Sequence, residues 1–282
     1  MKLAALALAA LALAAPAALA SPPERSFLVV CAPGSPGTTA EAQPTMDAFA
    51  AALAAKAGLP ATSLGAVYHE EEASGVARLR AKDAALALVS LPFYLKHERE
   101  LALRARLQAV PKGRSETERW ALVARKGRVA SSAALEGFTI ASTAGFAPAF
   151  VRGPALGSWG RLPAGVRIVQ SGAVLSALRR AAAGEPVAVL LDGAQEAALG
   201  SLPFASELEV VTRSPPLPGG VVAVVDARLS PRSWGALETA LQRLPSDSAG
   251  AAALDAIQMT RFTELDAQAL SRAHKAYAEA TP

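Results

Sequence analysis

Short runs of apolar residues, unbroken by polar positions, constrain the fold of this chain more than any other feature. The clearest are residues 84–89 (AALALV), 187–191 (VAVLL) and 221–225 (VVAVV). Each is too short to be a typical buried helix, and a strand that is apolar at every position must be covered on both faces. A parallel sheet with helices on both sides provides that cover. The runs therefore predict an α/β fold.

The first third of the chain alternates strand and helix patterns. Strands are predicted at residues 26–31 (SFLVVC) and 64–68, before the strand at 84–89. Between the first two, apolar residues recur every three or four positions from Ala42 to Ala57, which is typical of a helix. A second helix is predicted after the acidic residues 70–72. The order is strand, helix, strand, helix, strand, as in right-handed crossovers of a parallel sheet.

The start of the first helix has two interpretations. Either Pro44 is its first residue, or Thr38 or Thr39 caps a longer helix that contains Pro44. Gly58 stands where a C-terminal cap belongs.

The pattern restarts near residue 120, which indicates a second block. Its predicted elements are strands at 120–123, 138–141, 166–170 and 187–191, and a helix through Val174, Leu178 and Ala181 that Ser171 caps and Gly184 ends. We therefore expect two lobes, one made of residues 21–118 and 222–282 and the other of residues 119–221.

The predicted connections between the lobes surround a proline-rich segment. Residues 208–212 and 221–225 flank SPPLPGG, whose prolines and glycines prevent regular structure. Both runs are predicted to be crossover segments between the lobes. The remaining chain, residues 231–244 and from 249 to the end, has helical spacing and is predicted to cover the first lobe.

The N-terminus predicts export. Lys2 precedes an apolar stretch, and Ala18-Leu19-Ala20 before Ser21 has the small-residue pattern of a cleavage site. We interpret residues 1–20 as a cleaved signal peptide and place the mature protein in the periplasm; the alternative is an uncleaved anchor. Cys31 is the single cysteine, so no intramolecular disulfide is expected, and it is interpreted as a buried thiol.

Charge and motifs argue against two classes of function. The net charge of +4 is small, which does not indicate a nucleic-acid surface. The chain contains no S-x-x-K, G-x-S-x-G, H-E-x-x-H or P-loop motif, so no enzyme or cofactor is predicted. His69 beside Glu70 and Glu72 is a weak metal alternative, against which a charged surface is the preferred interpretation, and no metal site is predicted.

Five segments together resemble one family of exported proteins. They are APGSPGTT with the helix EAQPTMDAFAAAL, then VSLPFYL, VQSGAVLSALRRAAAGEPVAVLLDG, SPPLPGGVVAVV and AALDAIQMTRF. In this order and spacing they resemble the periplasmic phosphate-, phosphite- and phosphonate-binding proteins of ABC transporters, a branch of the type 2 periplasmic binding proteins. The resemblance covers nearly all of the mature chain.

The resemblance implies a venus-flytrap fold, in which two α/β lobes are joined by two crossover strands. A monomer would bind a small anionic solute between the lobes and present it to an ABC permease; the alternative is a sensory protein that serves a membrane receptor. The chain departs from the family at Val89-Ser90-Leu91-Pro92, where an aromatic-x-Gly-Pro sequence is usual, and at Pro186-Val187, where many relatives have aspartate. The identity of the solute is therefore left open.

Candidate ligand-binding residues follow the predicted strands or begin helices, where hydroxyls and backbone N–H groups can donate to an oxyanion. They are Ser35, Gly37, Thr38, Thr39, Ser90, Ser142, Thr143 and Ser171, with Tyr68 and Tyr94 as an aromatic wall and Asp192 as an acceptor for a protonated ligand oxygen. Each also has a structural alternative: hydroxyls cap helices, aspartate ends strands, and tyrosines fill cores.

Overall fold

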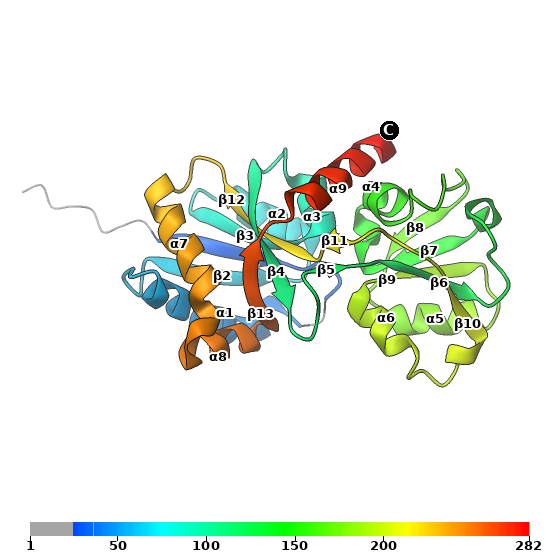
Figure 1. Ribbon diagram of the computed structural model, residues 1–282, viewed down its shortest axis with the longest axis horizontal. Helices are drawn as coiled ribbons and strands as arrows, with labels where there is room; N and C mark the ends of the chain where they lie inside the picture. The colour runs from blue at the N-terminus through cyan, green and yellow to red at the C-terminus, as the bar shows by residue number, and fades with distance from the viewer. Residues whose placement is uncertain (1–24, 36, 282) are drawn as a thin grey trace, which may run out of the picture.

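Two α/β lobes lie side by side in the computed structural model (Figure 1), which describes residues 25–35 and 37–281. The predicted two-lobed α/β fold is confirmed. The predicted signal peptide, residues 1–20, lies outside the described residues. Within the described part, no helix combines the length and the hydropathy that a membrane span needs.

The first lobe, lobe I, is built on a six-stranded sheet in the order β13-β4-β12-β3-β1-β2. Its strands are β1 (Ser26–Cys31), β2 (Leu64–His69), β3 (Ala84–Ser90), β4 (Leu103–Pro111), β12 (Gly220–Val225) and β13 (Met259–Glu264). Strands β1, β2 and β3 are parallel, as predicted, but β12 runs antiparallel to both β3 and β4. An apolar run indicates that both faces of a strand are covered, but it does not indicate whether the strand runs parallel or antiparallel to its neighbours.

Two strands of this sheet do not follow from the apolar runs. β4 begins with alternating charged residues, and β13 (MTRFTE) buries only Phe262. The prediction of helix from residue 249 onward is therefore wrong at β13. An edge strand with one covered face can bury few residues, so β13 has neither an apolar run nor a regular alternation that would predict a strand.

The helices of lobe I are α1 (Thr39–Lys56), α2 (Glu72–Arg80), α3 (Leu91–His97), α7 (Pro231–Arg243) and α8 (Ser248–Ala256). Thr38 caps α1 in a capping box with Glu41, and Pro44 lies inside the helix, which decides between the two interpretations of its start. Gly58 has a positive φ of 67° just after the helix, as a C-terminal cap requires.

The second lobe, lobe II, has a five-stranded sheet in the order β10-β6-β9-β7-β8. Its strands are β6 (Ala121–Arg125), β7 (Thr139–Ser142), β8 (Arg167–Gln170), β9 (Val187–Leu191) and β10 (Leu208–Arg213). Its helices are α4 (Pro148–Phe150), α5 (Val174–Ala182) and α6 (Gly193–Leu199), with the 3-10 turns η1 (Ser132–Leu135), η2 (Thr143–Phe146) and η4 (Ala205–Glu207) and the π turn η3 (Val151–Ala155).

Ser171 does not cap α5, so that prediction is wrong. The helix begins at Val174 after Ala173, and the Ser171 backbone N–H donates to the Ser142 carbonyl oxygen at 2.9 Å. Ser171 thus continues the pairing of β8 with β7 and lies too early to serve as the cap. The predicted end of the helix is confirmed, since Gly184 follows it with a φ of 91°.

The connections between the lobes also differ from the prediction. Residues 208–212 and 221–225 are not crossovers but belong to β10 of lobe II and β12 of lobe I. The crossing segments lie between them and before β6, and they pair with each other through the short strands β5 (Thr117–Glu118) and β11 (Leu217–Pro218). Pro218 has no backbone N–H to donate, but the ladder can accommodate it because it contains only two residue pairs, Leu217 with Glu118 and Pro218 with Thr117.

Buried Ser214 extends this pairing. Its backbone N–H donates to the Trp120 carbonyl oxygen at 2.8 Å, and its hydroxyl accepts from the backbone N–H of Trp120 at 2.9 Å. The two connections thus form one hydrogen-bonded unit.

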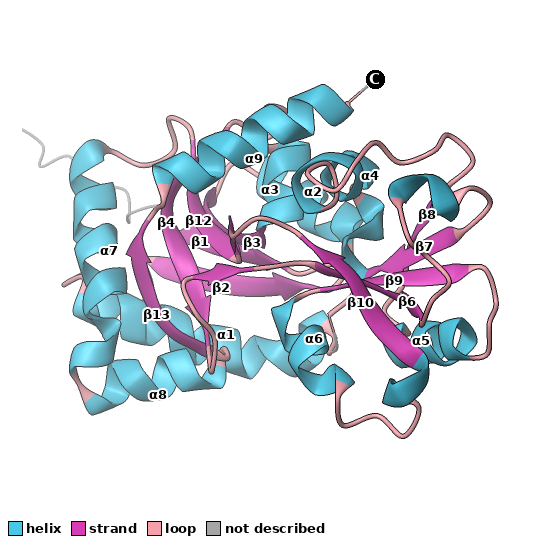
Figure 2. Cartoon of the chain, turned by 45° about the vertical axis from the view of Figure 1, so that its right-hand side comes forward, coloured by secondary structure: helices cyan, strands magenta, loops and turns pink. Residues whose placement is uncertain are grey.

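The last helix, α9 (Ala267–Ala280), reaches across to lobe II (Figure 2), so the prediction that the whole tail covers lobe I is wrong for it. It packs on η3, where the Cα of Gly153 is so close that an added Cβ would lie 2.1 Å from the Ala276 carbonyl oxygen. On its other side, His274 Nε2 lies 2.8 Å from Glu98 Oε2, next to α3. The close approach of η3 and α9 depends on Gly153 facing an alanine-rich helix. Neither the glycine nor the alanines indicate in the sequence that these two segments meet.

We predict that Gly153→Ala lowers the free energy of unfolding by about 1–3 kcal/mol, because the new methyl group would overlap backbone atoms of α9 that cannot rotate away. Urea denaturation measures the change. Gly235→Ala in α7 is the matched control: an added Cβ there meets no atom within 4 Å, and alanine is the better helix former, so stability should rise by up to about 1 kcal/mol. Equal stability of Gly153→Ala and the wild type would contradict the close contact.

Candidate ligand-binding cleft

A cavity of about 390 Å³ lies between the lobes, where strands of both sheets end. Lobe I contributes the loop after β1 and the end of β3, lobe II contributes η2 and the start of α6, and the paired connections close one side. This volume is in the range of small-molecule sites, and the position beyond strand ends is where open α/β sheets bind ligands. We call this cavity the cleft.

Four of the predicted site residues line the cleft: Ser35, Ser90, Thr143 and Asp192. The hydroxyls of Ser35, Ser90 and Thr143 make no hydrogen bond within the described residues. Ser35 and Ser90 belong to lobe I and Thr143 to lobe II, so free donors face the cleft from both lobes. These three side chains are available to a ligand.

The predicted residues around the start of α1 are engaged elsewhere. Thr38 Oγ1 donates to Glu41 Oε2 at 3.0 Å, and the Thr39 N–H and hydroxyl both donate to Glu70 Oε2, at 3.1 and 2.9 Å. Gly37, with a φ of 93°, is the turn residue before this cap. The protein's own carboxylates therefore occupy the positive end of α1, and none of these three residues lines the cleft.

The remaining predicted residues lie in packed regions. Ser142 is fully buried, and its hydroxyl donates to the Leu190 carbonyl oxygen at 2.8 Å. Tyr68 and Tyr94 are core residues; the Tyr94 hydroxyl accepts from the Ala105 N–H at 3.3 Å, and burial raises its pKa to about 12. Together with Ser171, none of them lines the cleft.

Two charged residues of the cleft that the sequence did not predict, Arg114 and Glu118, lie beside Asp192. Arg114 Nη1 lies 3.1 Å from Glu118 Oε2, and Arg114 Nη2 lies 3.6 Å from Asp192 Oδ1. Asp192 also caps α6, accepting from the N–H groups of Ala194 and Gln195 at 2.8 and 2.9 Å. The sequence showed Arg114 and Glu118 only as part of the polar run KGRSETER, and nothing in it placed that run beside Asp192.

Glu118 is held in an environment that disfavours its charge. Its side chain is only 10% exposed, and burial, reinforced by the negative charge of Asp192, raises its pKa to about 7; Arg114 opposes this shift. The β5–β11 pairing places it, since Glu118 lies opposite Leu217 in that ladder. Near neutral pH the carboxyl is thus present in both forms, as an acceptor and as an O–H donor.

Trp120 presents a buried donor without a partner. It lines the cleft, is 4% exposed, and its indole Nε1 has no hydrogen bond within the described residues. Its ring packs edge-on against Phe150 with centroids 5.2 Å apart, which fixes its orientation. A buried N–H without a partner is uncommon in folded proteins, so this nitrogen marks an unsatisfied position beside the cleft.

The alternative metal site of His69 with Glu70 and Glu72 does not form in the structure. Glu72 is paired instead with His97 Nε2 and Lys96 Nζ, both at 2.6 Å. Among residues 25–35 and 37–281, no three His, Cys, Asp or Glu side chains form a group that could hold a metal ion.

Comparison with known proteins identifies the fold. No protein-family model and no curated protein sequence matches the chain. Among solved structures, XAC2383 from Xanthomonas citri bound to chloride superposes with a TM-score of 0.70 at 15% identity, over 90% of this chain and 98% of that one.

Two further structures are binding proteins for phosphonates by their descriptions. The binding component of an ABC phosphonate transporter from Pseudomonas aeruginosa gives a TM-score of 0.61 at 14% identity, over 88% of this chain and 83% of that one. PhnD1 from Prochlorococcus marinus in complex with methylphosphonate gives 0.58 at 13%, over 92% and 98%. At these identities the likeness establishes the fold: the chain has the two-lobed fold of type 2 periplasmic binding proteins.

We predict that Glu118→Gln removes a pH-dependent loss of stability. The folded pKa of about 7 lies above the ordinary value of 4.5, so the native state favours the protonated carboxyl. That stabilisation is complete below pH 4.5 and is lost as the pH rises through 7. Relative to the glutamine variant, the wild type should lose up to about 3 kcal/mol of unfolding free energy between about pH 4.5 and pH 8.

Urea denaturation of both proteins across this pH range measures the difference, and the titrations shared by both cancel. A constant difference in stability at all pH values would contradict the raised pKa of Glu118.

Proposed function

We propose that this protein is an exported solute-binding protein that captures a small oxyanion in the cleft and delivers it to an ABC importer. The observation that carries the proposal is the set of hydroxyls that line the cleft and have no hydrogen-bond partner in the described structure, those of Ser35, Ser90 and Thr143. Donors without internal partners, held on two lobes around one small cavity, suit a ligand made of acceptor oxygens.

The charge in the cleft is compatible with an anion only if Glu118 is protonated. Arg114 and Asp192 then balance each other, and the Glu118 O–H becomes a further donor. An approaching anion favours this form, because a nearby negative charge raises a carboxyl pKa further. Anion binding is therefore proposed to take up a proton at Glu118 when the pH is above about 7.

The ligands of the structural neighbours support this choice of solute class. XAC2383 is described with chloride and also with ATP, and PhnD1 with methylphosphonate, and all three ligands are anions. An ancestral arginine-binding protein of similar fold is described with arginine, so the fold alone does not fix the charge of the solute. Phosphate, phosphite and phosphonates are the proposed candidates for this chain, and their shared chemistry is a compact group of acceptor oxygens.

The proposed mechanism is closure of the lobes on the solute. Donors on both lobes can reach one small ligand together only when the lobes approach, and the paired connections, with β5 and β11, provide the place where the chain bends. The proposed partner recognises the closed form. That partner is an ABC permease, residues 1–20 are a signal peptide, and the mature protein acts in the periplasm as a monomer.

We predict that one of phosphate, phosphite or methylphosphonate raises the melting temperature of the mature protein and binds with a stoichiometry of one. Ser90→Ala and Thr143→Ala should each weaken that binding by about tenfold, because each removes a hydrogen bond to a charged group. Ser201→Ala, on the exposed surface beyond α6, is the matched control and should bind like the wild type.

Isothermal titration calorimetry measures these affinities. Binding restricted to uncharged or cationic compounds would overturn the oxyanion proposal. Silence with every solute tested would favour the alternative, a protein of this fold that serves a membrane receptor.

We also predict that the affinity for the oxyanion falls as the pH rises from about 6 to about 8, because Glu118 loses its proton over this range. Glu118→Gln should bind with an affinity close to that of the wild type at pH 6 and should show a weaker pH dependence. Titration of the ligand itself contributes equally to both proteins, so calorimetry on the pair isolates Glu118. An affinity that rises with pH in the wild type alone would indicate a solute with a cationic group beside Glu118.

A further inference from the structure

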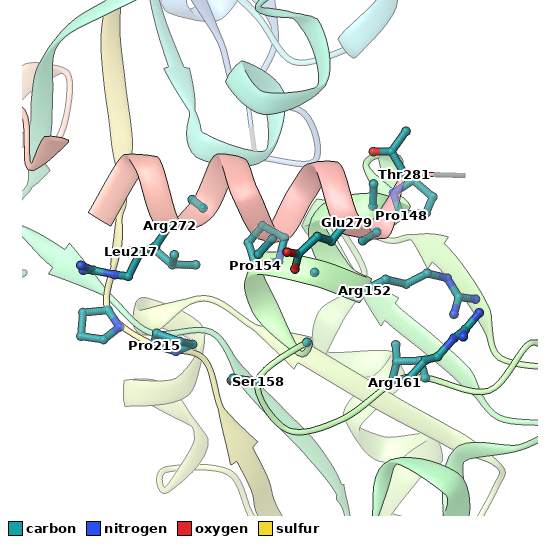
Figure 3. A pocket seen from close by; sticks show the side chains of 18 of the residues that line it. Pro148, Arg152, Pro154, Ser158, Arg161, Pro215, Leu217, Arg272, Glu279 and Thr281 are labelled. Carbon is teal, nitrogen blue, oxygen red and sulfur yellow. The ribbon is translucent and has the colours of Figure 1, made fainter. Parts of the chain in front are cut away.

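A second cavity lies between α9 and lobe II (Figure 3) and has a volume of about 960 Å³. Its walls come from η3 and the loop that follows it, from α9, and from residues 215–217 of the returning connection. It shares no lining residue with the cleft. We call it the α9 cavity.

The middle of the α9 cavity is apolar. Pro154, Pro215 and Leu217 line it together with alanines of α9, among them Ala273 and Ala276. Pro154, Leu217 and Ala273 are themselves buried, so this lining is fixed by packing and does not depend on flexible surface side chains. The surface suits an apolar body.

The ends of the cavity carry positive charge. Arg152 and Arg161 lie together at one end and Arg272 at the other (Figure 3). Arg152 is held in place by donating to the carbonyl oxygens of Pro163 and Val166, at 3.3 and 3.2 Å. Arg161 and Arg272 are exposed and make no hydrogen bond or ion pair within the described residues.

Glu279 is the one carboxylate among the residues that line this cavity, all of which belong to the described part of the chain. Three guanidinium groups against one carboxylate leave a net positive charge. Free guanidinium donors are best satisfied by carboxylate or phosphate oxygens.

We propose that the α9 cavity is a second binding site, for a small amphiphilic anion with an apolar body and a carboxylate or phosphate head. The body lies on the proline, leucine and alanine surface, and the head is bound by Arg161 or Arg272. The volume lies in the range of small-molecule sites, which favours such a ligand over a protein segment. Occupancy of this site does not require a solute in the cleft.

Decanoate, used below the concentration at which it forms micelles, is the probe for this site. Isothermal titration calorimetry on the full mature protein should show saturable binding with a stoichiometry of one. Decyl phosphate should also bind and reports whether the site prefers a phosphate head to a carboxylate. Decanol and decyltrimethylammonium should bind at least about tenfold more weakly, because neither offers acceptor oxygens with negative charge to the arginines.

The double variant Arg161→Gln with Arg272→Gln should weaken decanoate binding by about tenfold or more, since it removes charge-assisted hydrogen bonds. Both positions are exposed, so the fold should be retained. The matched control is Arg232→Gln with Arg243→Gln. Both are exposed residues of α7 whose side chains make no hydrogen bond or ion pair in the described structure, and this variant should bind decanoate like the wild type.

Absence of saturable binding, equal binding of decanol, or unchanged affinity in the Arg161/Arg272 variant would each overturn the proposal. Loss of decanoate binding in the Ser90→Ala, Thr143→Ala double variant would also overturn it, because the probe would then occupy the cleft. Failure of oxyanions to bind in the cleft bears only on the proposed solute-binding function and leaves the α9 cavity result to be judged by its own variants.

Discussion

The pairing of the two connections between the lobes is the constraint on which the relation between the lobes depends most directly. One short ladder, β5 with β11, is extended by the two hydrogen bonds between Ser214 and Trp120, so the chain leaves lobe I and returns to it as a single unit. The same ladder sets Glu118 in the cleft and Leu217 in the wall of the α9 cavity. Each lobe keeps its own sheet, while the relation between the lobes depends on a few residues.

Contacts beyond the connections also bridge the lobes. Helix α9 follows β13 of lobe I, yet it packs on η3 of lobe II where Gly153 allows close approach. Lys96 of α3 donates to the carbonyl oxygen of Phe146 in η2 at 2.7 Å, and its ammonium lies 5.6 Å from the Phe146 ring centroid. Any change in the angle between the lobes must preserve or exchange these contacts, so the energy of such a motion depends on them as well as on the hinge.

Hydroxyl side chains illustrate how the same residue types take different roles. Thr38, Thr39 and Ser142 complete hydrogen bonds within the protein, with Glu41, Glu70 and the Leu190 carbonyl oxygen. Ser35, Ser90 and Thr143 follow strands in the same way along the sequence but find no internal partner in the described structure. Whether a carboxylate or carbonyl oxygen lies within hydrogen-bond distance of a hydroxyl depends on segments that are distant in sequence. Hydroxyls that have no such acceptor within the protein therefore indicate a candidate binding site.

The sequence by itself determined that two α/β blocks form, because strands buried on both faces must be apolar throughout. It also determined helix ends such as those at Gly58 and Gly184, because the positive φ at these positions favours glycine. Of the residues it proposed as ligand contacts, the structure places Ser35, Ser90, Thr143 and Asp192 in the lining of the cleft. Only the tertiary structure decided the direction of β12, the edge strand β13, the position of α9 and the meeting of Arg114, Glu118 and Asp192. Apolar periodicity and capping are local properties of the chain, whereas strand direction, close packing and the shifted pKa of Glu118 arise from segments that are distant in sequence and adjacent only after folding.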